Sequence, residues 1–193
     1  IVEVDLPHAA HAIPVYYLVA TAETSSNLAR YDGVRYGARA EDAEDLASMY
    51  ARTREEGFGP EVKRRIMLGT FVLSAGYNDQ LYAKALQVRT LIARDFEAAL
   101  RHVDLIATPT SPTTAFRLGE RIEDPVQMYL ADVFTAGAPL AGLPALSVPC
   151  GFGADGLPVG LQIVGPRHRD DLVLQAAFAF EQARPWADRW PEI

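Results

Sequence analysis

Few side chains in this sequence have both the type and the spacing that a chemical site requires. His102 and Asp104 alternate along the chain, as two members of a catalytic triad can. We interpret them more simply, as a histidine at a helix end and a carboxylate at a strand edge. No neighbouring residue would activate the thiol of Cys150, so we interpret it as a small core residue beside Pro149.

Several common sites are excluded by inspection. The sequence has no Gly-x-Ser-x-Gly nucleophile elbow, and neither of its two lysines follows a glycine, so a phosphate-binding loop is absent. The formal net charge of −7 argues against a general nucleic-acid binder, because neutralising phosphates requires a basic surface. The four histidines and one cysteine lack the spacing of a zinc site: His8, His11, His102, His168 and Cys150.

Length and composition are those of a globular protein, with 193 residues of which 49% are hydrophobic and 22% charged. No apolar run approaches the roughly 18 residues of a membrane span, and no signal peptide is visible. A single cysteine cannot form an internal disulfide, which favours a reducing, cytoplasmic location. Because the chain begins without methionine inside a strand-like segment, we expect it to be a piece of a longer protein.

Apolar periodicity predicts helices that alternate with short strands, which is an α/β fold. Prolines near the predicted helix starts and glycines or prolines after the ends support the boundaries. Helices are predicted over residues 14–28, 41–56, 60–77 and 81–100, with further helices from 124 through Asp132 and Val133 and from 170. Strands are predicted over residues 2–6, 103–108, 146–149 and 159–164.

Four segments carry a resemblance to a known family. The segments are residues 16–35 with Ser-Ser-Asn-Leu-Ala-Arg-Tyr-Asp-Gly, 57–70 with Gly-Pro-Glu-Val-Lys-Arg-Arg-Ile, Thr-Pro-Thr-Ser-Pro at 108–112, and 140–145 with 156–162. Together they resemble the amidase-signature family. The last two segments are shared across its amidases, whereas the first two are typical of the A subunits of aspartyl/glutamyl-tRNA amidotransferases.

This resemblance implies a fold and a reaction. The chain would be the C-terminal half of an amidase-signature α/β/α sandwich with a mixed central sheet, and residues 1–193 would form part of that single domain. The implied reaction is hydrolysis of glutamine or asparagine to release ammonia. Its nucleophile is a serine activated through a second serine and a lysine, which lie upstream in the family. We therefore expect no catalytic residue in this chain, and no activity from the chain alone.

The resemblance also assigns three substrate-binding residues by motif position. Arg65 would bind the α-carboxylate of glutamine, Asp132 its α-ammonium group, and Tyr16 would line the same pocket. A zwitterionic amino acid needs one fixed cation and one fixed anion, and guanidinium binds carboxylate in a planar, bidentate manner. Taken alone, the three residues have ordinary interpretations as a solvated helix face, a surface acid and core packing.

Partners and cofactors follow from the same resemblance. The expected partners are the B and C subunits of the amidotransferase, with tRNA bound through the complex and no membrane. ATP and magnesium are expected in the partner subunit, and no cofactor or metal in this chain. Two alternatives stay open: a piece of a free-standing hydrolase of small amides, and a non-catalytic module for assembly or amino-acid binding. The sequence does not distinguish a Gln-tRNA product from an Asn-tRNA product.

Overall fold

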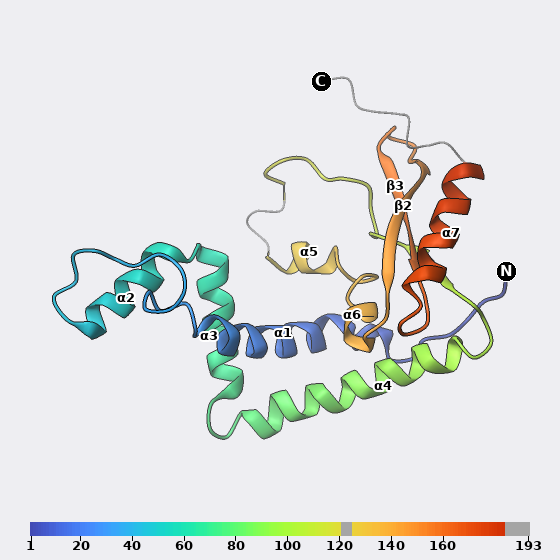
Figure 1. The fold of residues 1–193 in the computed structure, drawn as a ribbon. Helices are drawn as coiled ribbons and strands as arrows, with labels where there is room; N and C mark the ends of the chain where they lie inside the picture. The colour runs from blue at the N-terminus through green and yellow to red at the C-terminus, as the bar shows by residue number, and fades with distance from the viewer. Residues whose placement is uncertain (121–124, 184–193) are drawn as a thin grey trace. The chain divides into compact units, whose positions relative to one another are not determined.

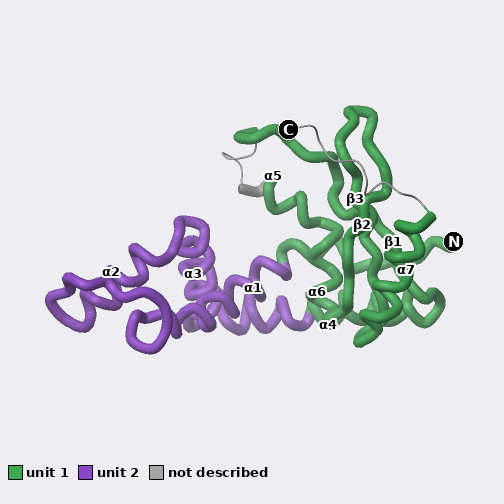
Figure 2. The backbone as a smooth tube through the Cα atoms, turned by 45° about the horizontal axis from the view of Figure 1, so that its top comes forward, with its two compact units in different colours: residues 1–14, 88–193 green, residues 15–87 purple. Residues whose placement is uncertain are grey.

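The computed structural model describes residues 1–120 and 125–183, and the chain separates into two compact units (Figure 2). Residues 15–87 form the first, which we call the helical unit. Residues 1–14 and 88–193 form the second, the sheet unit, because it holds the β-strands. The prediction that the whole chain is part of one domain is not tested by this division.

The helical unit is built from helices whose ends the sequence encodes locally. In chain order they are α1 (Ala12–Leu28), α2 (Leu46–Gly57), α3 (Pro60–Leu73) and the π-helical turn η2 (Asn78–Tyr82), which leads into α4 (Ala83–Ala99). The boundary between the units falls within α4, whose residues from 88 onward belong to the sheet unit. The prediction that α2 begins at residue 41 is wrong by five residues. Asp45 is the N-cap instead: its carboxylate accepts the Ser48 N–H at 2.7 Å, and the Ser48 hydroxyl accepts the Asp45 N–H at 3.0 Å.

The predicted end of the helix from residue 60 is also too late. Pro60 is at the first helical position, as expected, but α3 ends at Leu73 rather than at residue 77. Ser74 is extended, with ψ of 158°, and its hydroxyl donates to the Phe71 carbonyl at 2.7 Å. This local bond offers the backbone an alternative to another helical turn.

A glycine sets the separation of α1 and α3 where they cross. Gly69 is buried on α3, and a Cβ atom at this position would stand 1.9 Å from the carbonyl oxygen of Thr21 on α1. Thr21 is itself 2% exposed. Only a residue without a side chain allows the two backbones to approach this closely, so Gly69 fixes the register of the two helices.

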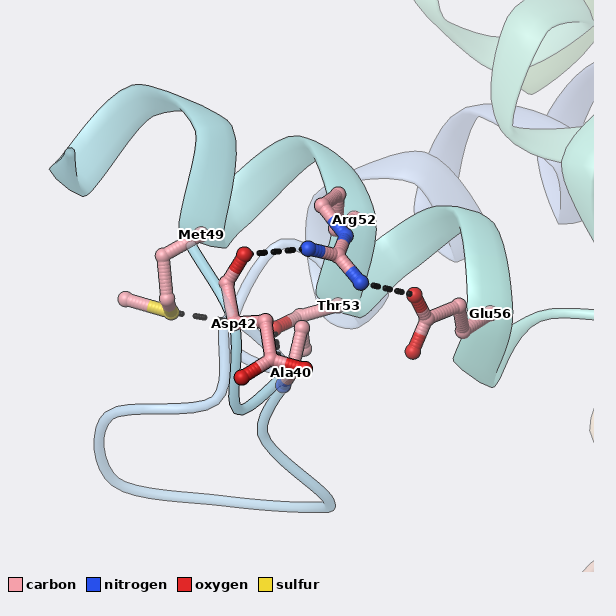
Figure 3. A network of polar contacts seen from close by, with 6 residues as sticks. All are labelled: Ala40, Asp42, Met49, Arg52, Thr53 and Glu56. Atoms are coloured by element: carbon pink, nitrogen blue, oxygen red, sulfur yellow. Dashed lines mark hydrogen bonds and ion pairs between the residues drawn. The ribbon is translucent and has the colours of Figure 1, made fainter. Parts of the chain in front are cut away.

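The long loop between α1 and α2 is held by side chains of α2 (Figure 3). Thr53 is 8% exposed, and its hydroxyl accepts the Ala40 N–H at 3.0 Å. Arg52 donates to the Asp42 carbonyl and pairs with Glu56 at 3.3 Å. Two hydrogen bonds therefore attach the loop to α2, a buried one to Thr53 and an exposed one from Arg52.

The sheet unit contains a three-stranded antiparallel sheet in the order β1-β3-β2. Its elements are η1 (Ala9–His11), β1 (Ile106–Pro109), α5 (Pro125–Leu130), α6 (Gly137–Ala141), β2 (Ala145–Phe152), β3 (Pro158–Val164) and α7 (Asp170–Ala183). Helix α7 lies along one side of the sheet, and α5 and α6 lie on the other (Figures 1 and 2). The core between α7 and the sheet centres on Val148, Ile163, Val173 and Ala177.

The α/β fold class is confirmed, and the strands that the structure describes are antiparallel throughout. The predicted strand over residues 2–6 is wrong: this segment forms no strand, and Val2 remains 67% exposed. An apolar, β-branched segment becomes a strand only where another strand pairs with it. The helix from residue 124 ends at Leu130, so it does not extend to Asp132, and residue 124 itself lies outside the described part of the chain.

Candidate functional site

Two of the three predicted site residues meet in the helical unit, where α1 and α3 cross. Tyr16 is half-buried on α1, and its ring packs edge-on against Tyr17 with centroids 5.1 Å apart. Arg65 on α3 places its guanidinium carbon 5.6 Å from the centroid of the Tyr17 ring. Its Nε donates to Glu61 Oε1 at 2.9 Å. We call these four residues the arginine–tyrosine cluster.

Arg65 is a cation that the cluster holds in place. Its side chain is 29% exposed, so it is accessible but partly desolvated. Burial alone would lower the pKa of Arg65, but hydrogen bonds with Tyr16 and Glu61 outweigh it, and the pKa is raised. The guanidinium is therefore fixed in charge and in orientation, as a site for a carboxylate ligand requires.

Glu61 is a member of the cluster that was not among the predicted site residues. It lies one turn before Arg65 and also pairs with Arg64, whose Nη1 is 3.1 Å from Glu61 Oε2. The spacing of a glutamate four residues before an arginine was the available signal, since such pairs share one helix face. Arg64 is 50% exposed, so the two arginines bind the same carboxylate from different environments.

Asp132 belongs to the sheet unit and lies in the turn between α5 and α6. Asp132 is exposed, and its main-chain carbonyl accepts the N–H groups of Thr135 at 3.1 Å and Ala136 at 3.0 Å. The expected helical position is wrong, because α5 ends two residues earlier. The structure thus brings Tyr16 and Arg65 together within one unit, and the joint binding of one ligand by Arg65 and Asp132 stays a prediction.

The sheet face opposite α7 carries short polar side chains. Gln162 on the central strand donates from Nε2 to the Thr108 hydroxyl at 2.9 Å and to the Phe134 carbonyl at 2.9 Å. The hydroxyls of Thr110 and Ser147 meet at 2.6 Å on the same face. Gln162 was singled out from sequence only as part of a motif, although one amide in an otherwise apolar strand was a visible signal.

His102 and Asp104 lie at a helix end and just before a strand, as interpreted from sequence, whereas Cys150 does not belong to the core. His102 donates its N–H to the Ala99 carbonyl at the end of α4, and both it and Asp104 are exposed. Cys150 is half-buried, and its thiol donates to the Val159 carbonyl at 3.4 Å across the β2–β3 pair. Within residues 1–120 and 125–183 we find no group of three or more potential metal ligands. The same residues include no helix long and apolar enough to cross a bilayer.

The fold is that of an α/β protein. The model of the Amidase family matches residues 1–174, and the chain belongs to this family. The matched residues include the arginine–tyrosine cluster and the turn that carries Asp132.

Relatives place the chain more finely. It is similar to the A subunit of glutamyl-tRNA(Gln) amidotransferase from Moorella thermoacetica, with 61% identity over 99% of this chain and 39% of the relative. The protein of the same name from Cyanothece sp. is 58% identical over 99% of this chain and 40% of the relative. The chain therefore spans about two fifths of the length of these relatives.

Solved structures agree with this placement. The crystal structure of the A subunit of glutamyl-tRNA(Gln) amidotransferase from Thermotoga maritima is 43% identical, with a TM-score of 0.67, over 95% of this chain and 34% of that one. A bacterial aryl acylamidase of the amidase-signature family has a TM-score of 0.66 at 23% identity, over 96% of this chain and 36% of that one. At that identity the likeness concerns the fold alone.

Proposed function

We propose that this chain is the substrate-binding part of the amidase subunit of a tRNA-dependent amidotransferase, and that it binds glutamine. The observation that carries the proposal is the arginine–tyrosine cluster. Arg65 is partly desolvated, charged and held by Glu61, and it faces the aromatic pair of Tyr16 and Tyr17. Such a guanidinium suits the α-carboxylate of an amino acid, and Asp132 would bind the α-ammonium group.

In this proposal the complete subunit hydrolyses glutamine and releases ammonia. A serine of a Ser-Ser-Lys set, outside these 193 residues, is the nucleophile, and the binding residues hold the amide carbon against it. The ammonia passes to a B subunit, assembled with a C subunit, which uses ATP and magnesium to activate Glu or Asp on tRNA. The complex would act in the cytoplasm. The names of the relatives from Moorella thermoacetica and Cyanothece sp. support this assignment.

A free-standing amidase is the second candidate, because the fold is shared with an aryl acylamidase. The two candidates differ in what the site must bind. A simple amide has no α-carboxylate, so a fixed cation at Arg65 would add nothing to its binding. The accessible, hydrogen-bonded guanidinium therefore favours an amino-acid substrate over a neutral amide.

A segment exchange tests the proposal. The part of the Moorella thermoacetica protein that matches this chain is replaced by residues 1–193, and the hybrid is assembled with that organism's own partner subunits. We expect glutamine-dependent ammonia release and conversion of Glu-tRNA to Gln-tRNA. A hybrid that cleaves simple amides but ignores glutamine would favour the free-standing amidase. A folded hybrid that cleaves neither would favour a non-catalytic module.

A further inference from the structure

One buried polar side chain in the sheet unit is not explained by packing. Gln162 is 5% exposed and lies on β3, the central strand of the sheet. The residues that follow it, Ile163 and Val164, are buried and apolar. A buried amide costs free energy unless it is hydrogen-bonded, so the bonds that it makes indicate what it does.

Both hydrogens of the Gln162 amide nitrogen are used. One bond goes to the hydroxyl of Thr108, its register partner on β1, at 2.9 Å. The other leaves the sheet and goes to the main-chain carbonyl of Phe134, also at 2.9 Å. Gln162 thus attaches a segment 28 residues earlier in the chain to the centre of the sheet.

The attached segment is the turn that presents Asp132. Phe134 lies two residues after Asp132, and the Asp132 carbonyl accepts the N–H groups of Thr135 and Ala136. These two hydrogen bonds close the turn, and Phe134 lies between the residues that they join. Fixing the Phe134 carbonyl fixes the backbone from which the Asp132 carboxylate projects.

Helix α6, which follows the turn, is anchored independently. Arg89 donates from Nε to the Leu140 carbonyl at 2.8 Å, and Arg167 donates from Nη2 to the Ala141 carbonyl at 2.8 Å. These bonds hold the far end of α6, whereas Gln162 holds the turn itself. Loss of the Gln162 bond would release the turn while the helix after it stays in place.

We infer that Gln162 is a positioning residue: it holds the turn of residues 131–136 so that the Asp132 carboxylate meets the α-ammonium group of the substrate. This inference rests on the proposed function, because it takes amino-acid binding by Asp132 from there. Gln162 itself contacts no substrate and acts through the Phe134 carbonyl. Its removal should weaken substrate binding and leave the chemical step almost unchanged.

A double-mutant cycle on the assembled amidotransferase tests the inference, with KM and kcat for glutamine as readouts. Gln162→Met keeps the length of the side chain and removes both donors. We expect it to raise KM about tenfold, the equivalent of one weakened charged contact, with kcat changed much less. Asp132→Asn should raise KM at least as much. The double variant should be no worse than Asp132→Asn alone, since a turn without the carboxylate has nothing left to position.

Ser147→Ala is the matched control, because Ser147 is the register partner of Gln162 on β2 and bonds to Thr110, not to the turn. It should leave KM unchanged. If the Met variant does not fold, Gln162→Leu replaces it, since its apolar side chain suits a buried position and cannot donate to the Phe134 carbonyl.

The outcomes separate the two claims. An unchanged KM for Asp132→Asn contradicts the proposed role of Asp132. A raised KM for Asp132→Asn with no effect of Gln162→Met overturns the positioning role alone. Effects of the two substitutions that multiply in the double variant also overturn it, because Gln162 would then act independently of Asp132.

Discussion

Replacing Gly69 with alanine should force α1 and α3 apart in the helical unit. The new Cβ atom would stand 1.9 Å from the carbonyl oxygen of Thr21, 2.5 Å from its carbonyl carbon and 2.9 Å from Ser25 Cβ. Two of these three atoms belong to the backbone and cannot rotate away. The helices must therefore separate by about 1 Å in a tightly packed interior.

The expected loss of stability is the difference between two effects. Overpacking against fixed backbone costs about 3 kcal/mol, the upper part of the usual range. Alanine in place of glycine within a helix stabilises the folded state by about 1 kcal/mol. We expect Gly69→Ala to lower the free energy of unfolding by about 2 kcal/mol, the difference between these costs.

The same substitution should also weaken substrate binding. Arg65 lies one turn before Gly69 on α3, and Tyr17 lies one turn before Thr21 on α1. Separation of the helices at the glycine would lengthen the 5.6 Å approach of the Arg65 guanidinium to the Tyr17 ring. The KM for glutamine of the assembled enzyme should rise together with the loss of stability.

Denaturant unfolding is the assay, with Gly57→Ala as the matched control. Gly57 is also helical, and a Cβ atom there has nothing within 4 Å. That variant should be as stable as the parent or slightly more stable. A Gly69→Ala protein that unfolds at the parent's midpoint or above would refute the close approach of α1 and α3 on which the cluster depends.

Two further predictions concern α2 and the loop before it. Thr53→Val should lower the free energy of unfolding by about 1–3 kcal/mol, because the buried Ala40 N–H loses its acceptor. Thr70→Val, at an exposed site of α3, is the control. Equal losses of the two variants in denaturant unfolding would contradict the anchoring role of Thr53. The N–H of Ser48, and then its hydroxyl, lower the pKa of Asp45 below its ordinary 3.8. The charged cap therefore stabilises α2 at pH above 3.8 and is lost as pH falls through the lowered pKa. Asp45→Asn should remove this contribution from an acid titration followed by circular dichroism, and an identical acid transition in both proteins would contradict it.

Elements with strong local signals could be predicted from sequence. The periodic apolar residues of α7 predicted its buried face, and Val173 and Ala177 do face the core. Pro60 after Gly59 predicted the start of α3. In each case the deciding interaction lies within a few residues of the chain, so the sequence contains it directly.

Elements that depend on distant residues could not be predicted in this way. The segment over residues 2–6 has the composition of a strand but finds no strand partner in the described structure. The bond from Gln162 to the Phe134 carbonyl joins residues 28 apart, and no local pattern indicates it. Glu61 lies between these cases: its spacing to Arg65 was visible, but its shared pairing with Arg64 was not.

The most direct test of glutamine binding at the arginine–tyrosine cluster compares two neighbouring arginines that share one partner. Arg65→Lys removes the planar guanidinium beside Tyr16 and Tyr17, while Arg64→Lys makes the same change at a position that is 50% exposed. Measured as KM for glutamine in the assembled amidotransferase, Arg65→Lys should raise KM about tenfold or more. Arg64→Lys should change KM by less than about twofold, because exposed ion pairs contribute little. Equal effects of the two substitutions, or no effect of Arg65→Lys, would contradict the assignment of this cluster as the carboxylate site.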